Sequence, residues 1–361
     1  MNAKQIIRRE RQKQAEWYNL RPILGNANWA IFYVLLGGRE IGKSYSVTNF
    51  FVDQFVNKGI PFTWLRLTEA ATRKLLQNNA EKLVDPDLRR KYNLDLVTSG
   101  NNVYHVTKRS EPDEKGHTKI LEKKLMARVY AISTFYNDKG SIFDKDFLSD
   151  PNMRYNVAID EFQREEGEKN TFDIVYSLVN QLENLLRSTK ERTKIFFLGN
   201  TLEESSDILC AFNFIPESWG IFKLKKKRAV IHNIAPTDAY IKRRTGTIAD
   251  ILMPKASTFT NKIDTDTTLI TKQRLVEPEY IIKFRKNTDS WYTVWDGNII
   301  KKWNGEKKKA LPMRPYLDEL YTPDAQKRVI ELFDSRALLF TNLITFKQFQ
   351  KELWLLKPRG K

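Results

Sequence analysis

Short apolar runs alternate with amphipathic stretches along the first 200 residues of the chain. The runs that are almost continuously apolar are 29–36, 62–67, 155–160 and 194–198. Such runs are typical of strands that are buried on both faces of a parallel sheet. Apolar residues at helical spacing occur between them, in 44–58 and 171–189. The pattern predicts strand–helix–strand units and therefore an α/β domain built on a parallel sheet.

The last hundred or so residues have a different pattern, which begins at Glu279. Strand-like runs occupy 280–284, 291–295 and 298–303, and an Asp296-Gly297 hairpin turn joins the last two. Helical patterns follow at 324–339 and 343–356. We therefore expect a small α+β domain at 273–361, a basic linker segment at 223–272 and a larger domain at 1–222.

The segment directly after the first apolar run fits the phosphate-binding pattern G-x-x-x-x-G-K-[ST]. Glycines let the backbone N–H groups of such a loop turn inward around a β-phosphate, and the following helix adds its positive N-terminal end. Lys43 is placed to reach the β- and γ-phosphate oxygens, and the Ser44 hydroxyl can complete a Mg²⁺ shell. The predicted nucleotide-binding residues are Gly37, Gly38, Arg39, Glu40, Ile41, Gly42, Lys43 and Ser44.

Polar side chains also follow two later strands, at the point where each strand ends. Asp160 ends one strand and is placed to hold Mg²⁺, as a Walker B aspartate does. Glu161 comes next and can deprotonate a water that attacks the γ-phosphorus, which indicates hydrolysis. Asn200 follows the strand 194–198. Because the carboxyl ends of parallel strands meet at one edge of a sheet, we expect these groups to share a site with Lys43.

The formal net charge of +17 is concentrated in residues 221–361, which hold 29 Lys and Arg against 15 Asp and Glu. A basic region behind a near-neutral nucleotide-binding region indicates a polyanionic partner, most simply nucleic acid, with plain solubility as the alternative. The basic runs 223–228 and 242–244 are the expected phosphate contacts. The single cysteine, Cys210, excludes an internal disulfide, and no apolar run has the length of a membrane span.

Four motifs occur in an order that resembles a known family: GGREIGKS, VAIDEF, LLRSTKER and KIFFLGN. Together they resemble the DNA-encapsidation ATPase of small phi-29-like tailed bacteriophages, a compact relative of the terminase large subunits. The similarity runs from about Tyr18 to Thr247. Arg39 fits, since packaging ATPases tend to carry an arginine inside the P-loop. Tyr18 and Asn19 match the segment that holds adenine in the family, although the same residues could simply be a helix end that packs on the domain.

The resemblance implies a P-loop ATPase fold of the additional-strand, catalytic-glutamate type. It also implies a ring motor, a homopentamer, that docks on the portal of an empty prohead and uses ATP and Mg²⁺ to move double-stranded DNA inward. A structural prohead RNA can join the portal and motor in this subgroup. The implied place is the host cytoplasm, transiently at the portal vertex, with no membrane involved.

Carried over residue by residue, the family's roles fall on the P-loop, on the ends of two strands and on an arginine of the helical stretch 171–189 or just after it. Lys43 and Ser44 act on phosphates and Mg²⁺, Asp160 on Mg²⁺, Glu161 as the catalytic carboxylate and Asn200 as a sensor. Arg187 matches the arginine finger that reaches a neighbouring subunit's ATP, with Arg192 as the alternative. An arginine in trans stabilises transition-state charge and ties hydrolysis to the order of the subunits.

Two departures from the family pattern affect the expectations. Residues 68–71 stand where a basic DNA-gripping loop would be expected, with Arg66, Arg73 and Lys74 as nearby substitutes. The strand 280–284 contains no Asp or Glu, whereas two-metal nucleases need several convergent carboxylates. We therefore expect a ribonuclease-H-like C-terminal domain that binds nucleic acid or portal without nuclease activity. Two other functions stay open, a phage or plasmid helicase or replication ATPase and a nucleotide-gated nucleic-acid-binding scaffold.

Overall fold

The computed structural model describes residues 17–114, 116–134, 155–162, 174–189, 193–200, 207–216, 218–252, 268–276, 278–283, 291–303 and 323–356. The chain forms two compact units. The first comprises Met1–Ile208 and Pro216–Ile263, and the second comprises Leu209–Ile215 and Asp264–Lys361. No helix among the described residues is long and apolar enough to cross a membrane.

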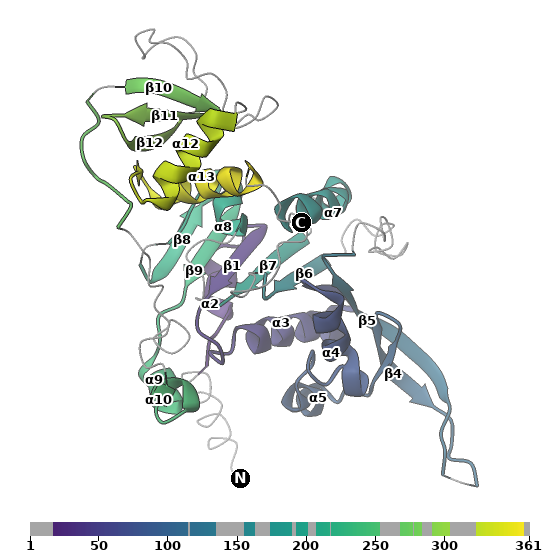
Figure 1. Ribbon diagram of the computed structural model, residues 1–361. Coiled ribbons are helices and arrows are strands. Elements are labelled where there is room, and N and C mark those ends of the chain that lie inside the picture. The colour runs from purple at the N-terminus through teal and green to yellow at the C-terminus, as the bar shows by residue number, and fades with distance from the viewer. Residues whose placement is uncertain are drawn as a thin grey trace. The chain divides into compact units, whose positions relative to one another are not determined.

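The first unit is built on a nine-stranded sheet in the order β3-β4-β5-β2-β6-β7-β1-β9-β8 (Figure 1). Its central strands are parallel, which confirms the mostly parallel α/β sheet predicted from the apolar runs. They are β1 (Phe32–Leu36), β2 (Phe62–Arg66), β5 (Ile120–Ala131), β6 (Tyr155–Asp160), β7 (Thr193–Gly199) and β9 (Ala229–Asn233). Antiparallel strands form the two edges of the sheet. They are β3 (Leu96–Ser99) and β4 (Asn102–Arg109) at one edge and β8 (Gly220–Leu224) at the other.

Helices connect or flank the strands of this sheet, and the two predicted from apolar periodicity, at 44–58 and 171–189, are present as α3 (Lys43–Lys58) and α7 (Ile174–Thr189). Another of the longer helices is α4 (Glu69–Ala80). The shorter ones are α2 (Arg21–Asn26), α5 (Pro86–Tyr92), α9 (Asp238–Arg244) and α10 (Ile248–Leu252), while α8 (Asp207–Ala211) contains the boundary between the two units in the chain. Phe51 of α3 is fully buried and packs against Trp64 of β2 and Phe196 of β7. This contact fixes the helix that follows the glycine-rich loop on the sheet.

Residues 69–92 form two helices, because the chain leaves helical geometry near the end of α4. Asn78 and Asn79 have φ values of 50° and 57°, in the left-handed region that asparagine tolerates better than most residues. Asp85 then caps α5 by accepting from the Asp87 N–H, with Pro86 in the first turn.

The large sheet continues beyond residue 222, where the sequence pattern placed the end of the first domain. The basic run 223–228 ends β8, forms the 3₁₀ turn Lys225–Lys227 and leads into β9. β9 pairs with β1 in parallel, with Phe32 opposite Ala229. Residues 223–252 are thus part of the first unit and not a linker. The lysines at the end of β8 and in the following turn interrupt the apolar pattern, so the sequence did not predict these two short strands.

The second unit contains a four-stranded sheet in the order β10-β11-β12-β13. Its strands are β10 (Pro278–Lys283), β11 (Trp291–Trp295), β12 (Ile299–Trp303) and β13 (Leu339–Phe340), and its helices are α12 (Pro323–Asp334) and α13 (Leu343–Leu356). Asp296 and Gly297 have φ values of 48° and 89°, as the predicted hairpin turn requires. Tyr292, Phe340 and Phe349 form the aromatic core of this unit. The ribonuclease-H-like assignment stays a prediction.

Candidate active site

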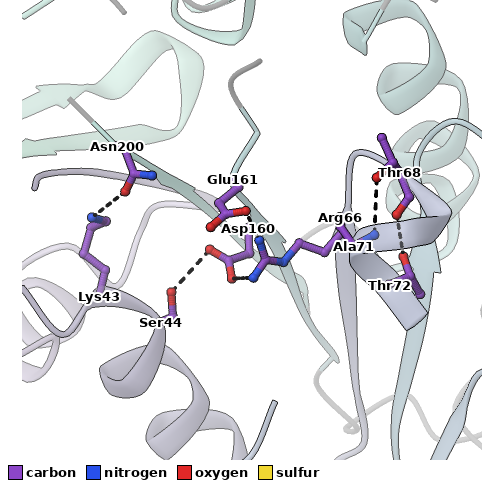
Figure 2. Close-up of polar contacts among 9 residues, drawn as sticks. All are labelled: Lys43, Ser44, Arg66, Thr68, Ala71, Thr72, Asp160, Glu161 and Asn200. Atoms are coloured by element: carbon purple, nitrogen blue, oxygen red, sulfur yellow. Dashed lines mark hydrogen bonds and ion pairs between the residues drawn. The ribbon is translucent and has the colours of Figure 1, made fainter. Parts of the chain in front are cut away.

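The central strands bring the predicted site residues to one edge of the sheet. β6, β7 and β1 are neighbours, with Asp160 opposite Leu198 and Leu36 opposite Gly199. The residues that follow these strands therefore emerge side by side, as expected for the carboxyl ends of parallel strands. Lys43, Ser44, Asp160, Glu161 and Asn200 all lie at this edge (Figure 2).

The loop between β1 and α3 has the backbone of a tight phosphate-binding turn. Gly42 has a φ of 96° and precedes α3, whose Ser46 N–H donates to the Gly42 carbonyl at 2.9 Å. A Cβ atom at Gly42 would lie 3.2 Å from Cε3 of Trp17, so a side chain here would be both strained and crowded. Glu40 also has a positive φ, of 65°.

Lys43 is 6% exposed, and its ammonium group lies among loop carbonyls. Its Nζ donates to the carbonyl oxygens of Gly37 at 2.7 Å and Gly38 at 2.8 Å, and to Asn200 Oδ1 at 3.4 Å. Burial lowers the pKa of Lys43 to about 8, while the carboxylates of Asp160 and Glu161 act in the opposite direction. The lysine is thus a poorly hydrated cation whose partners are neutral oxygens, and a negatively charged phosphate group can replace them.

Ser44 and Asp160 form the donor pair expected for a divalent cation. The Ser44 hydroxyl donates to Asp160 Oδ1 at 3.3 Å, and Asp160 is 5% exposed. Burial raises the pKa of Asp160, and the cations of Arg66 and Lys43 oppose that shift. Among the described residues no group of three or more His, Cys, Asp or Glu side chains could hold a metal ion. A hydroxyl and one carboxylate fit Mg²⁺, which usually keeps several waters and takes its other ligands from the substrate's phosphates.

Arg66 joins the two carboxylates that follow β6, although the sequence pattern offered it as a DNA-gripping substitute. Its Nη2 lies 3.2 Å from Asp160 Oδ2, and its Nη1 donates to Glu161 Oε2. Arg66 is the last residue of β2, which pairs directly with β6, so its side chain reaches the end of the neighbouring strand (Figure 2). The segment 68–71, where the family pattern would have a basic gripping loop, begins with Thr68, whose hydroxyl accepts from the Ala71 N–H and caps α4.

Glu161 lies just past the end of β6, in a left-handed conformation with a φ of 52°. Its N–H donates to the Leu198 carbonyl at 2.9 Å, while its side chain is 57% exposed. Asp160 is therefore buried in the sheet edge, whereas Glu161 is turned outward where a substrate water can reach it. The separation of a buried from an exposed carboxylate is what distinct metal-binding and base roles require.

Tyr18 and Asn19 lie against the loop, with their polar groups engaged by the protein. The Tyr18 N–H donates to the Ile41 carbonyl at 2.9 Å, and its hydroxyl is 3.2 Å from His232 Nδ1. Asn19 Oδ1 accepts from the Arg21 N–H at 3.0 Å. These contacts anchor the segment beside the P-loop, and a role in holding a base stays a prediction.

The two candidate arginine fingers lie partly or wholly outside the described residues. Arg187 belongs to α7, but its side chain lies outside the described residues. Arg192 lies outside them altogether. Arg39 is in the P-loop and is exposed. The roles of these arginines therefore stay predictions.

Comparison with known proteins supports the fold. No protein-family model and no curated protein sequence matches the chain. The phi-28 gp11 DNA packaging motor matches with a TM-score of 0.58 and 14% identity, over 96% of this chain and 99% of that one. The bacteriophage phi-29 viral genome packaging motor assembly matches with a TM-score of 0.58 and 18% identity, over 94% and 98%. The resemblance drawn from the four motifs is thus confirmed in the fold, along nearly the whole chain.

Proposed function

We propose that this chain is an ATP-hydrolysing ring motor that moves viral double-stranded DNA into a preformed prohead. The observation that carries the proposal is the meeting of Lys43, Ser44, Asp160, Glu161 and Asn200 at one sheet edge. The fold, shared along its length with two phage DNA packaging motors, supplies the context. Binding of ATP and Mg²⁺ and assembly of five subunits are parts of this proposal.

The substrate's phosphates bind to the P-loop amides and to Lys43, which exchanges its contacts with the Gly37 and Gly38 carbonyls for phosphate oxygens. Ser44 and Asp160 would hold Mg²⁺, which neutralises charge on the β- and γ-phosphates when bound. Asn200, which contacts Lys43, would act as the sensor of the γ-phosphate. The adenine-holding role proposed for Tyr18 and Asn19 belongs to the same model.

Glu161 orients and deprotonates the attacking water. For this its carboxylate must give up at least part of its bond to Arg66, because a carboxylate that accepts from a guanidinium is a weaker base. Arg66 keeps its second partner, Asp160, so the arginine stays in place while Glu161 turns to the water. The arrangement suits hydrolysis and not transfer to an organic acceptor.

The ring proposal assigns the remaining predicted roles to surfaces between subunits. Arg187, or Arg192 in its place, would reach the ATP of a neighbouring subunit and add positive charge in the transition state. The ring would dock on the portal of the prohead in the host cytoplasm, where a structural RNA can take part. The C-terminal region, 273–361, would bind nucleic acid or portal and lack nuclease activity.

The test is phosphate release by the full-length protein with Mg²⁺ and ATP, with and without duplex DNA. DNA should stimulate hydrolysis by the parent, and Glu161→Gln should lower the rate about 100-fold to 10,000-fold while ATP still binds. Glu122→Gln, which removes an exposed carboxylate of β5, should hydrolyse ATP at the parental rate. If Glu161→Gln and the parent release phosphate equally fast, the proposed catalytic site is overturned.

The two other functions give different results in companion assays. A helicase or replication ATPase would separate the strands of a forked substrate, whereas a packaging motor leaves the duplex intact. A nucleotide-gated scaffold would bind nucleic acid and ATP without DNA-stimulated phosphate release. Either result would replace the packaging proposal.

A further inference from the structure

We propose that Arg244 is a positioning residue of the nucleotide site, which braces the P-loop through Glu40. Arg244 ends α9, about 200 residues after the loop, and its Nη1 lies 3.2 Å from Glu40 Oε2. From the sequence this arginine belongs to a basic run expected to contact nucleic-acid phosphates. The inference rests on the proposed nucleotide site and goes beyond it by giving a different part of the chain control over the loop.

The helix α9 is fixed to the sheet strand that carries the loop. Ile234, just after β9, donates its N–H to the Leu36 carbonyl at 2.8 Å. The hydroxyl of Thr237 caps α9 by accepting from the Tyr240 N–H, and Tyr240 is fully buried in the main core. Arg244 lies one helical turn after Tyr240, on the same face, and its side chain is only 10% exposed. The arginine is therefore presented to the loop by a rigid element.

Glu40 is the loop residue that needs such support. It occupies the left-handed region with a φ of 65°, where a side chain is strained and a glycine is not. A strained residue keeps its conformation only when surrounding contacts hold it there. Among the described residues, the ion pair with Arg244 is the contact that holds the Glu40 side chain. Since Glu40 is 70% exposed, the pair contributes chiefly by fixing a conformation and little by Coulomb energy.

The neighbouring arginine makes a second contact to the same side of the loop. The guanidinium carbon of Arg243 lies 3.9 Å from the centre of the Trp17 ring, and that ring lies close against Gly42. α9 thus reaches the loop at Glu40 directly and at Gly42 through Trp17. Two adjacent arginines that face the loop from one helix are placed as a brace, and not as an exposed phosphate-binding run.

Loss of the brace should weaken nucleotide binding without changing the chemistry. A loop that samples other conformations binds with an affinity reduced by the fraction of time it is competent. Glu161 and Asp160 do not contact Arg244, so hydrolysis at saturating ATP should keep its rate. We expect Arg244→Gln to raise the Kd for a non-hydrolysable ATP analogue, and the KM for ATP, by roughly threefold to tenfold with little change in kcat.

The decisive measurement is a double-mutant cycle on the full chain by calorimetric titration of the Mg²⁺ complex of that analogue. Glu40→Gly places a residue that adopts a positive φ without strain, so the loop no longer needs the brace. Arg244→Gln should then have no further effect in the Glu40→Gly background. Lys242→Gln removes an exposed cation from the same helix and should leave the Kd unchanged. Arg244→Lys keeps the charge, should retain most of the affinity, and replaces the Gln variant in the cycle if the latter does not fold.

The outcomes separate this inference from the proposed function. If the parent binds the analogue and Lys43→Ala does not, but Arg244→Gln binds as the parent does, the brace alone is overturned. An equal loss from Arg244→Gln in the parent and in the Glu40→Gly background would also overturn it, since Arg244 would then act through some other contact. A parent that binds no analogue would overturn the proposed nucleotide site, and the brace with it.

Discussion

The two ends of the strands in the nine-stranded sheet both carry charged residues, but they use them differently. At the carboxyl ends, Lys43, Asp160 and Arg66 are largely buried and contact one another or the loop. At the amino end of β1, the turn Lys225–Lys227 is exposed, and no ion pair joins these lysines to another described residue. Burial and mutual pairing turn charges into a site with defined geometry and altered pKa values. Exposed lysines in a row form a surface for a polyanion.

Removal of Lys43 should have the largest effect at the carboxyl ends. Lys43→Ala deletes the buried cation that lies next to the predicted phosphate position, and we expect kcat/KM for ATP to fall about 100-fold to 1,000-fold. Lys58→Ala, at the exposed end of the same helix α3, is the matched control and should hydrolyse ATP normally. Steady-state phosphate release measures both. Similar kinetics in the two variants would show that burial of Lys43 has no bearing on function.

Replacement of Arg66 should have its main effect on stability. Arg66→Leu leaves the buried Asp160 without its nearest cation, and we expect the free energy of unfolding to fall by about 3 kcal/mol. Arg73→Leu is the control, because Arg73 is 79% exposed and pairs with Glu69 one turn earlier on α4. That surface pair should contribute less than about 1 kcal/mol. Urea denaturation compares the two, and equal losses would contradict the buried network.

The pH dependence of ATP affinity should reveal the altered pKa of Lys43. In the free protein this pKa is about 8, so above pH 8 the lysine must take up a proton when it binds phosphate. Affinity should then fall by up to about tenfold per pH unit, and calorimetry in buffers of different ionisation enthalpy should detect the proton uptake. An affinity that stays constant from pH 7 to 9.5 would contradict the assignment.

The same shift affects stability with a definite sign. The folded-state pKa of Lys43 is below its ordinary value of 10.5, so between about 8 and 10.5 the unfolded chain binds more protons than the folded one. The free energy of unfolding of the parent should therefore rise with pH across this window, relative to that of Lys43→Met.

The exposed turn at the amino end should give the smallest effect, and one confined to nucleic acid. A variant with Lys225, Lys226 and Lys227 changed to serine should bind duplex DNA roughly threefold to tenfold more weakly, with a shallower dependence on salt. Its DNA-independent phosphate release should equal that of the parent. Serine at Lys58, Lys82 and Lys91 removes three exposed charges elsewhere and serves as the control. If both triple variants lose the same affinity for duplex DNA, the turn Lys225–Lys227 is not a specific DNA-binding surface.

Much of the site could be predicted because its signals are local. Lys43, Asp160 and Asn200 each follow an apolar run, and parallel strands bring their carboxyl ends together whatever their order. The role of Arg66 could not be predicted, because its contact with Asp160 and Glu161 depends on β2 lying next to β6. No pattern within one segment contains that information.

The two basic runs show the same limit in another form. Runs 223–228 and 242–244 have similar composition, yet one is an exposed turn and the other ends a helix that faces the P-loop. A local signal for the second did exist, since Tyr240 and Arg244 are four residues apart and share one face of a helix. The positive charge of both runs indicated a polyanionic partner. The direction in which a basic side chain points depends on the apolar residues beside it, as Tyr240 shows for Arg244.

The most direct test of the proposed coupling is the amount of duplex DNA that becomes resistant to nuclease when the full-length protein, portal-bearing proheads and ATP are mixed. We expect intact double-stranded DNA to be protected with the parent protein and ATP, and none with Glu161→Gln. Protection that is equal for the parent and Glu161→Gln, or steady ATP hydrolysis that protects no DNA or separates its strands, would contradict the account.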